Sequence, residues 1–104
     1  MAAEGNNIIR RYIYRGEEGE VIPRDGQIIV IVHKDITVIL AEAFRGHRNI
    51  IEVICHEDVE KIEEYAFWNC TSLKRVIMPG VKVVERGAFA FCTALTDVKF
   101  GNKL

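Results

Sequence analysis

The sequence predicts an α/β fold, a short solenoid in which each repeat of about 22 residues contributes parallel strands and a helical turn. The dipeptide Ala-Phe begins at positions 43, 66 and 88, and aliphatic residues and cysteines recur at the same spacing. A repeat unit this short cannot bury its apolar side chains alone, whereas stacked units share one continuous core. The equivalent positions are Ala43-Phe44, Ala66-Phe67 and Ala88-Phe89; Val30, Val53, Val76 and Val98; Ile50, Leu73 and Leu95; and Cys70 and Cys92.

Composition and charge narrow the class of protein. The chain has 104 residues, the length of one domain, and its 49% of apolar and 28% of charged residues are typical of a globular protein. Its 14 Lys and Arg against 15 Asp and Glu leave no basic excess for phosphate contacts, so we expect no nucleic-acid partner. The longest apolar run, residues 28–32, is far shorter than the ~20 residues that span a bilayer, so we expect no membrane insertion.

Residues 1–26 lie outside the repeat and are expected to form an N-terminal capping segment, because the open end of a solenoid needs a cover. Residues 8–14 alternate loosely in polarity, two glycines then indicate a turn, and a short β-rich run follows. This pattern predicts a hairpin. We expect Tyr12 or Tyr14 to cover the layer of Phe44.

Each repeat unit divides into three parts by its local pattern. In the second unit, residues 52–55 are β-branched and predict a strand, and residues 59–62 predict a second, shorter strand. Residues 64–69 place Ala and Phe next to each other and favour a helical turn. Stacking would align equivalent strands in a parallel sheet, and residues 27–104 contain about three and a half units.

The third unit shows the consensus most clearly. From Leu73 to Cys92 it reads L-x-x-V-x-M-P-x-V-x-x-V-x-x-G-A-F-x-x-C. This line resembles that of the BspA-like leucine-rich repeat family, L-x-x-V-x-I-P-x-x-V-x-x-I-G-x-x-A-F-x-x-C-x-x-L. The resemblance covers residues 27–104. It implies a right-handed leucine-rich-repeat solenoid in a family of surface or recognition proteins, and it implies no catalytic residue.

Two departures from the family line concern the corner after the first strand. Proline occurs there only as Pro79, and the first two units carry His33 and His56 instead. The asparagine ladder of ordinary leucine-rich repeats is also absent, so the corner must be held differently. Stacked histidines, with His47 in the cysteine column, are a weak signal for a metal site, which needs three or four ligands at fixed geometry. We expect no metal site.

The residues of hydrolytic enzymes are not arranged for catalysis. Ser72 is the only serine, and it lies in a turn before a strand. Cys55 and His56 are neighbours on a strand, so their side chains point to opposite faces. Glu63 and Glu85 occupy equivalent positions of the repeat. Stacking would bring any two acidic residues of one column together in this way, so the pair is no specific sign of catalysis. We therefore expect no enzyme activity and no cofactor.

The three cysteines are an odd number, so they cannot form a closed set of intrachain disulfides. Cys55 occupies an apolar repeat position and is expected to face the core. Cys70 and Cys92 would stack with parallel Cα–Cβ bonds, which holds their Cβ atoms too far apart for a disulfide. Unpaired cysteines and the absence of a signal-peptide pattern favour a cytoplasmic location.

The outward face of the first strand of each unit points to a function. If alternate residues enter the core, stacking produces an outward column of isoleucines beside a column of alternating charge. Exposed apolar columns often mark contact sites, so we predict a non-enzymatic binding module that contacts a protein or peptide. The alternative is a structural segment of a longer array, or a self-associating scaffold, in which the isoleucines reflect β-propensity alone. The predicted partner-binding face consists of Ile31, Ile54, Ile77, Glu52 and Arg75.

The C-terminal end of the repeat predicts a second contact. Residues 95–100 begin a fourth coil that is not completed, so a strand edge and part of the core would stay uncovered. We expect two copies to close this end as a two-fold homodimer. The competing interpretation is that the chain is a fragment and that further repeats cover the end. The residues of this self-association end are Leu95, Val98, Phe100, Phe89 and Phe91.

Overall fold

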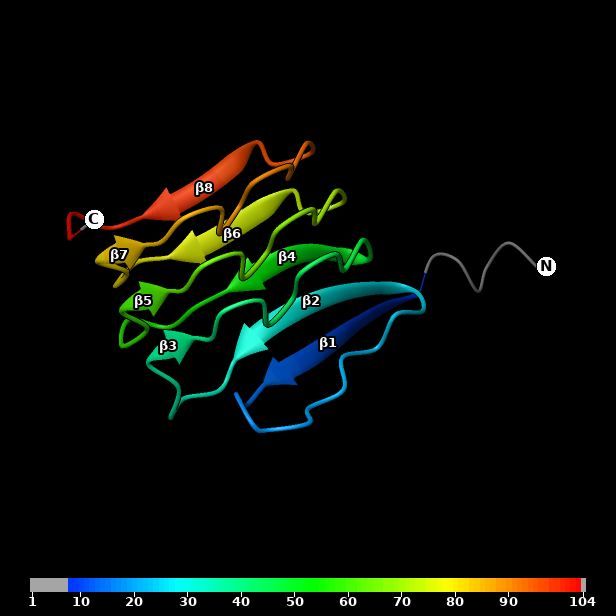
Figure 1. Ribbon diagram of the computed structural model, residues 1–104, viewed down its shortest axis with the longest axis horizontal. Helices are drawn as coiled ribbons and strands as arrows, with labels where there is room; N and C mark the ends of the chain where they lie inside the picture. Colours follow the sequence, from blue (N-terminus) through cyan, green and yellow to red (C-terminus); the bar gives the residue numbers. More distant parts are fainter. Residues whose placement is uncertain (1–7, 104) are drawn as a thin grey trace.

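The computed structural model of the protein describes residues 8–103, which form two parallel sheets wound into a solenoid (Figure 1). Within residues 8–103 every regular element of secondary structure is a strand. In this part of the chain no helix is long and apolar enough to cross a membrane. The larger sheet contains β1 (Ile9–Tyr14), β2 (Gln27–Val32), β4 (Ile50–Ile54), β6 (Arg75–Met78) and β8 (Asp97–Phe100). The smaller sheet contains β3 (Val38–Ile39), β5 (Lys61–Ile62) and β7 (Val83–Val84).

The repeat period sets the order and register of the strands. The larger sheet has the order β1-β2-β4-β6-β8 and the smaller sheet the order β3-β5-β7, so neighbouring strands come from successive coils. All of these neighbours pair in parallel. Val53 lies opposite Val30 on one side and opposite Val76 on the other, and each of these valines is one repeat away in the sequence. The parallel-strand solenoid that the period predicts is therefore confirmed.

The helical turn that the sequence predicts at residues 64–69, and at its equivalents, is wrong, because these residues form non-helical turns. The amide of Phe67 donates to the carbonyl of Ala88 in the next coil, with an N···O distance of 2.7 Å. An α-helix would instead use this amide for the carbonyl four residues earlier. Tyr65 and Asn69 also have φ of 58° and 61°, which no right-handed helix accommodates. Bonding between coils therefore replaces bonding within a helix.

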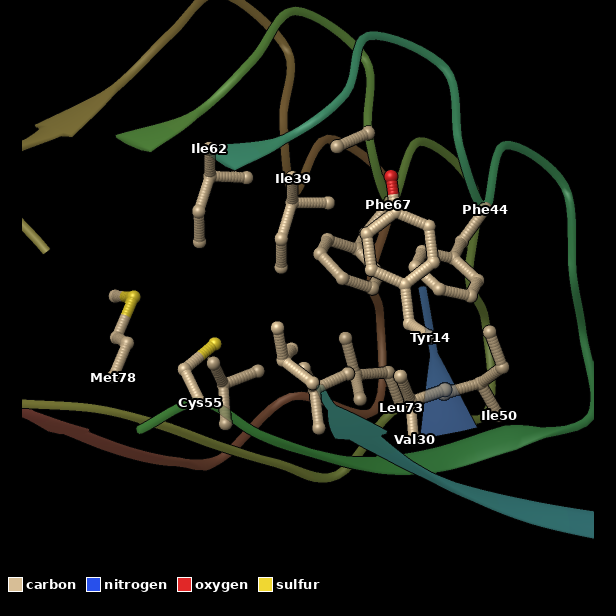
Figure 2. Close-up of a cluster of buried hydrophobic side chains, with 14 of the residues drawn as sticks. Tyr14, Val30, Ile39, Phe44, Ile50, Cys55, Ile62, Phe67, Leu73 and Met78 are labelled. Carbon is tan, nitrogen blue, oxygen red and sulfur yellow. The ribbon is translucent and has the colours of Figure 1, made fainter. Parts of the chain in front are cut away.

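A stack of aromatic rings runs through the core (Figure 2). The rings of Phe44 and Phe67 lie 5.0 Å apart and those of Phe67 and Phe89 lie 5.2 Å apart, with planes tilted by only 6° and 2°. Tyr14 covers the other side of Phe44 at 5.0 Å. Of the two candidate tyrosines, Tyr14 thus covers the first layer of the core, and its side chain is 3% exposed.

The N-terminal segment is not a hairpin, so this expectation is wrong. β1 pairs with β2 in parallel, from Ile9 opposite Gln27 to Tyr14 opposite Val32, and residues 21–23 form no strand. Parallel neighbours need a crossover of about a dozen residues, and residues 15–26 supply it. The segment therefore adds one further strand to the larger sheet.

The carboxylate of Glu20 organises this crossover. It accepts hydrogen bonds from the hydroxyl of Tyr12 and from the backbone amides of Arg15 and Glu17, each amide at 3.0 Å. Burial alone would raise the pKa of Glu20, but these hydrogen bonds outweigh it, so the pKa lies below its ordinary value. The crossover thus depends on an ionised carboxylate.

Candidate binding surfaces

The outward face of the larger sheet carries the predicted isoleucines side by side. Ile54 lies opposite Ile31 on β2 and opposite Ile77 on β6. All three side chains are partly exposed, whereas their neighbour Val53 is fully buried. The alternation of inward and outward residues is therefore as the sequence predicts.

β1 extends this column by one residue that the repeat did not predict. Ile13 lies opposite Ile31 and is 43% exposed. Ile13 precedes Ile31 by less than one full repeat, so the period does not place it beside Ile31. The hairpin expected from the sequence would also have made its strand antiparallel to the neighbouring one. The loose alternation of residues 8–14 was the only available signal. We call Ile13, Ile31, Ile54 and Ile77 the isoleucine row.

The charged residues beside the isoleucine row pair with one another. Arg75 lies between two carboxylates, with Nη1 3.8 Å from Oε2 of Glu52 and Nε 3.1 Å from Oδ2 of Asp97. Ion pairs this exposed contribute about 1 kcal/mol or less each. Because these charges are already paired within the sheet, the isoleucine row is the part of the face whose burial by a partner would release the most free energy.

β8 exposes positions that are buried in β2, β4 and β6. Val98 is 37% exposed and Phe100 is 58% exposed, whereas the equivalent Val76 and Met78 are 0% and 5% exposed. Phe91 is 63% exposed at the same end. The remaining predicted residues of this end, Phe89 and Leu95, are partly buried and pack against the core.

The cysteines are held in unreactive surroundings. Cys55 is 3% exposed, as the repeat predicts, and burial raises the pKa of its thiol to about 12. Cys70 donates from Sγ to the carbonyl of Phe44 at 3.1 Å, and Cys92 donates to the carbonyl of Phe67 at 3.2 Å. Because the thiolate is the reactive form of cysteine, these thiols are poor nucleophiles at neutral pH.

The stacked histidines hold the backbone at the corner after the first strand. Nδ1 of His33 accepts from the amide of Asp35 at 3.2 Å, and Nδ1 of His56 accepts from the amide of Asp58 at 3.1 Å. Nε2 of His56 lies 3.0 Å from the carbonyl oxygen of His33, so it donates to the previous coil. These bonds hold the corner that has no asparagine ladder. Within residues 8–103, no group of three or more His, Cys, Asp or Glu is placed to hold a metal ion.

Other titratable groups singled out in the sequence also have structural roles. Glu63 accepts from the amide of Ala41 at 3.1 Å, and Glu85 lies 3.6 Å from Nζ of Lys61. His47 is 6% exposed, and burial, with a smaller contribution from a nearby arginine, lowers its pKa. A neutral His47 therefore occupies the position that the later coils fill with cysteine.

Comparison with known proteins gives the family. The family model described as BspA type leucine rich repeat region (6 copies) matches residues 27–104. No curated protein matches the chain. The crystal structure of a leucine rich cell surface protein from Faecalibacterium prausnitzii A2-165 matches with a TM-score of 0.63 and 20% identity, over 71% of this chain and 25% of that chain. A likeness at this identity supports the fold alone. Because the family match covers more than half of its residues, the chain belongs to the BspA-type leucine-rich repeat family.

Proposed function

We propose that the protein is a non-enzymatic binding module that contacts a protein or peptide through the isoleucine row. The observation that supports this function is the row itself, four large apolar side chains in register on neighbouring strands of one sheet face. Burying such side chains yields about 25 cal/mol for each Å² of apolar surface removed from water. A partner that covers the row would gain this free energy at several adjacent positions.

The surroundings of the row define the chemistry of the partner. Arg75 is already shared between two carboxylates of the same sheet, so the face offers few unpaired charges next to the row. The partner is therefore a protein surface or peptide segment with apolar side chains rather than a charged one. Its affinity should depend little on ionic strength, because salt weakens mainly contacts between exposed charges.

The function can be tested by selecting binders from a library of random peptides displayed on phage, with the wild-type chain as bait. The decisive variant is Ile54→Glu, which places a charge in the middle of the row. A matched control is Leu40→Glu, because Leu40 is 46% exposed outside the row and the next two coils carry Glu63 and Glu85 at its position. Fluorescence polarisation then gives the dissociation constant of each selected peptide.

We expect the selected peptides to be rich in apolar residues, as the row requires. Ile54→Glu should weaken their binding by at least ~10-fold, the loss typical of a central contact residue. Leu40→Glu should leave it unchanged. Peptides that bind the two variants equally well would show that the row is not the site.

The second candidate is a structural segment of a longer array or a self-associating scaffold. The observation that favours it is the uncovered core at the C-terminal end, where Val98 and Phe100 are exposed. Under this function no peptide is enriched above background on the wild-type chain. The selection therefore separates the two candidates.

A further inference from the structure

The strands of the larger sheet all begin at one edge, and two arginines lie in the segments that lead into them (Figure 1). Arg24 lies shortly before β2 and Arg48 shortly before β4. Because β2 and β4 are neighbouring parallel strands, these segments meet at the same edge. The side chain of Asn49 joins them, since its Nδ2 donates to the carbonyl of Pro23 at 2.8 Å. Each arginine is therefore the sequence neighbour of a residue in this hydrogen bond.

The two arginines line a hollow between these segments. Its volume is about 440 Å³, and Gly46 and Asn49 form the rest of its lining. Small-molecule sites have volumes of ~300–1,000 Å³, so the hollow is large enough for a small ligand. A Cβ atom on Gly46 would meet no atom within 4 Å, so the space beside this residue is open. We call Arg24, Gly46, Arg48 and Asn49 the arginine hollow.

The positive charge of the arginine hollow is not neutralised by the described part of the chain. Within residues 8–103, neither Arg24 nor Arg48 forms an ion pair, and both are exposed. Asp25, which follows Arg24, pairs with Arg10 instead, with Oδ2 2.9 Å from Nη2. Burial, and then the charge of Arg24, lowers the pKa of His47. The charge of Arg24 therefore acts on the loop that carries Arg48.

The repeat itself does not require an arginine at position 48. The equivalent positions of the next two units are Thr71 and Thr93. His47 likewise stands where those units carry cysteine, and its buried Nδ1 has no hydrogen-bond partner among the described residues. The chain thus departs from its own repeat at two adjacent positions beside the hollow. Because one departure adds an unpaired charge to the hollow, it indicates a role other than folding.

We propose that the arginine hollow binds a phosphate group, either as inorganic phosphate or as the monoester of a small molecule. A guanidinium presents its N–H donors in a planar fork that matches two phosphate oxygens, so two arginines can hold one phosphate group together. A phosphate monoester carries a charge of about −1.5 to −2 at neutral pH, so it offsets the charge of both arginines. A monocarboxylate offsets the charge of one at most.

The site is tested by titrating inorganic phosphate and phenyl phosphate into the isotope-labelled chain and following its backbone amide signals by NMR. We expect the signals of residues 46–49 to shift and to saturate. The decisive variant is Arg48→Thr, because both later units carry threonine at this position and the fold should survive. Arg48→Thr and Arg24→Gln should each weaken phosphate binding at least ~10-fold, the loss expected for a charge-assisted contact.

The matched control is Arg86→Gln, which removes an exposed arginine of the third unit, outside the hollow. It should leave phosphate binding unchanged, and circular dichroism shows whether each variant is folded. The two probes separate the sources of the phosphate group. Tighter binding of phenyl phosphate means that the hollow also contacts the organic part of an ester, whereas equal or weaker binding points to the free anion.

Three results would overturn this site. They are inorganic phosphate and phenyl phosphate that shift no signal of residues 46–49, acetate that binds as tightly as phosphate, and folded arginine variants that bind phosphate like the wild type. Ile54→Glu should not change phosphate binding, because the isoleucine row lies on the sheet face and the hollow lies where the strands begin. Failure of the row as a peptide site and failure of the arginine hollow can therefore be told apart.

Discussion

Gly87 meets two demands that only glycine satisfies together. Its φ is +65°, and a Cβ atom there would lie 2.6 Å from two carbon atoms of the Tyr65 ring in the previous coil. Gly87→Ala should therefore lower the free energy of unfolding by roughly 1–3 kcal/mol, because it adds backbone strain and displaces the ring. Urea denaturation measures the loss. Gly46→Ala is the control, since Gly46 has φ of +74° and a Cβ atom there would meet no atom within 4 Å. Equal losses in the two variants would contradict the contact with Tyr65.

Burial was predictable residue by residue, whereas backbone conformation was not. The repeat placed Cys55 and Phe67 in the core, and they are 3% and 0% exposed, because an apolar residue at a recurring position has to face the shared interior. Glu42, Tyr65 and Phe91 have φ of about 60°. Residue types like these rarely adopt positive φ, so their sequence carries no signal for it. At Glu42 and Tyr65 the backbone amide donates to a carbonyl of the adjacent coil, and these hydrogen bonds stabilise the conformation there.

The elements follow the repeat wherever a repeat exists. The strands from β2 to β8 recur with the period of the Ala-Phe dipeptides, and this period sets their parallel register, apart from a one-residue shift between Ile28 and Ile29 where β2 meets β4. β1 lies outside the period, so its direction depends on the length of the crossover that follows it. Two glycines in that crossover resemble a hairpin turn, and this is why the sequence predicts the wrong direction. The turns around Ala-Phe look helical by composition, but alternate amides, such as those of Tyr65, Phe67 and Asn69, bond to the next coil. Local composition therefore fails where bonding runs between coils.

The crossover after β1 should be sensitive to acid through Glu20. The pKa of Glu20 in the folded state lies below its ordinary value of 4.5, so the ionised carboxylate favours folding. This contribution is fully present above that value and is lost as the pH falls through the folded-state pKa. Glu20→Gln should therefore melt at a lower temperature than the wild type at neutral pH, and the difference should shrink on acidification below about pH 4.5.

Differential scanning fluorimetry across this pH range measures the difference in melting temperature. Glu18→Gln, in the same loop, is the matched control, because Glu18 is exposed and its removal should leave the melting temperature unchanged. A Glu20→Gln difference that stays constant down to pH 3 would contradict the role of the ionised carboxylate.

In the whole molecule, strand contacts run between neighbouring coils, so the two ends differ from the middle. β4 has a strand on both sides, whereas β1 and β8 each have one.

The sequence predicts the residues of the candidate surfaces only in part. Three members of the isoleucine row could be predicted from the period, but Ile13 could not, because its place depends on the direction of β1. The positions of Val98 and Phe100 were predictable from the same period, because they lie opposite Val76 and Met78.

Hydrogen exchange measures how backbone protection varies across the larger sheet. The Asp97 amide bonds to the carbonyl of Lys74 within the chain, so it should be protected. The adjacent Val98 amide faces away from β6, so it should exchange faster than that of Asp97. Amides of β4, which has paired strands on both sides, should exchange slowly. A Val98 amide that exchanges as slowly as those of β4 would contradict the alternation of backbone groups along β8.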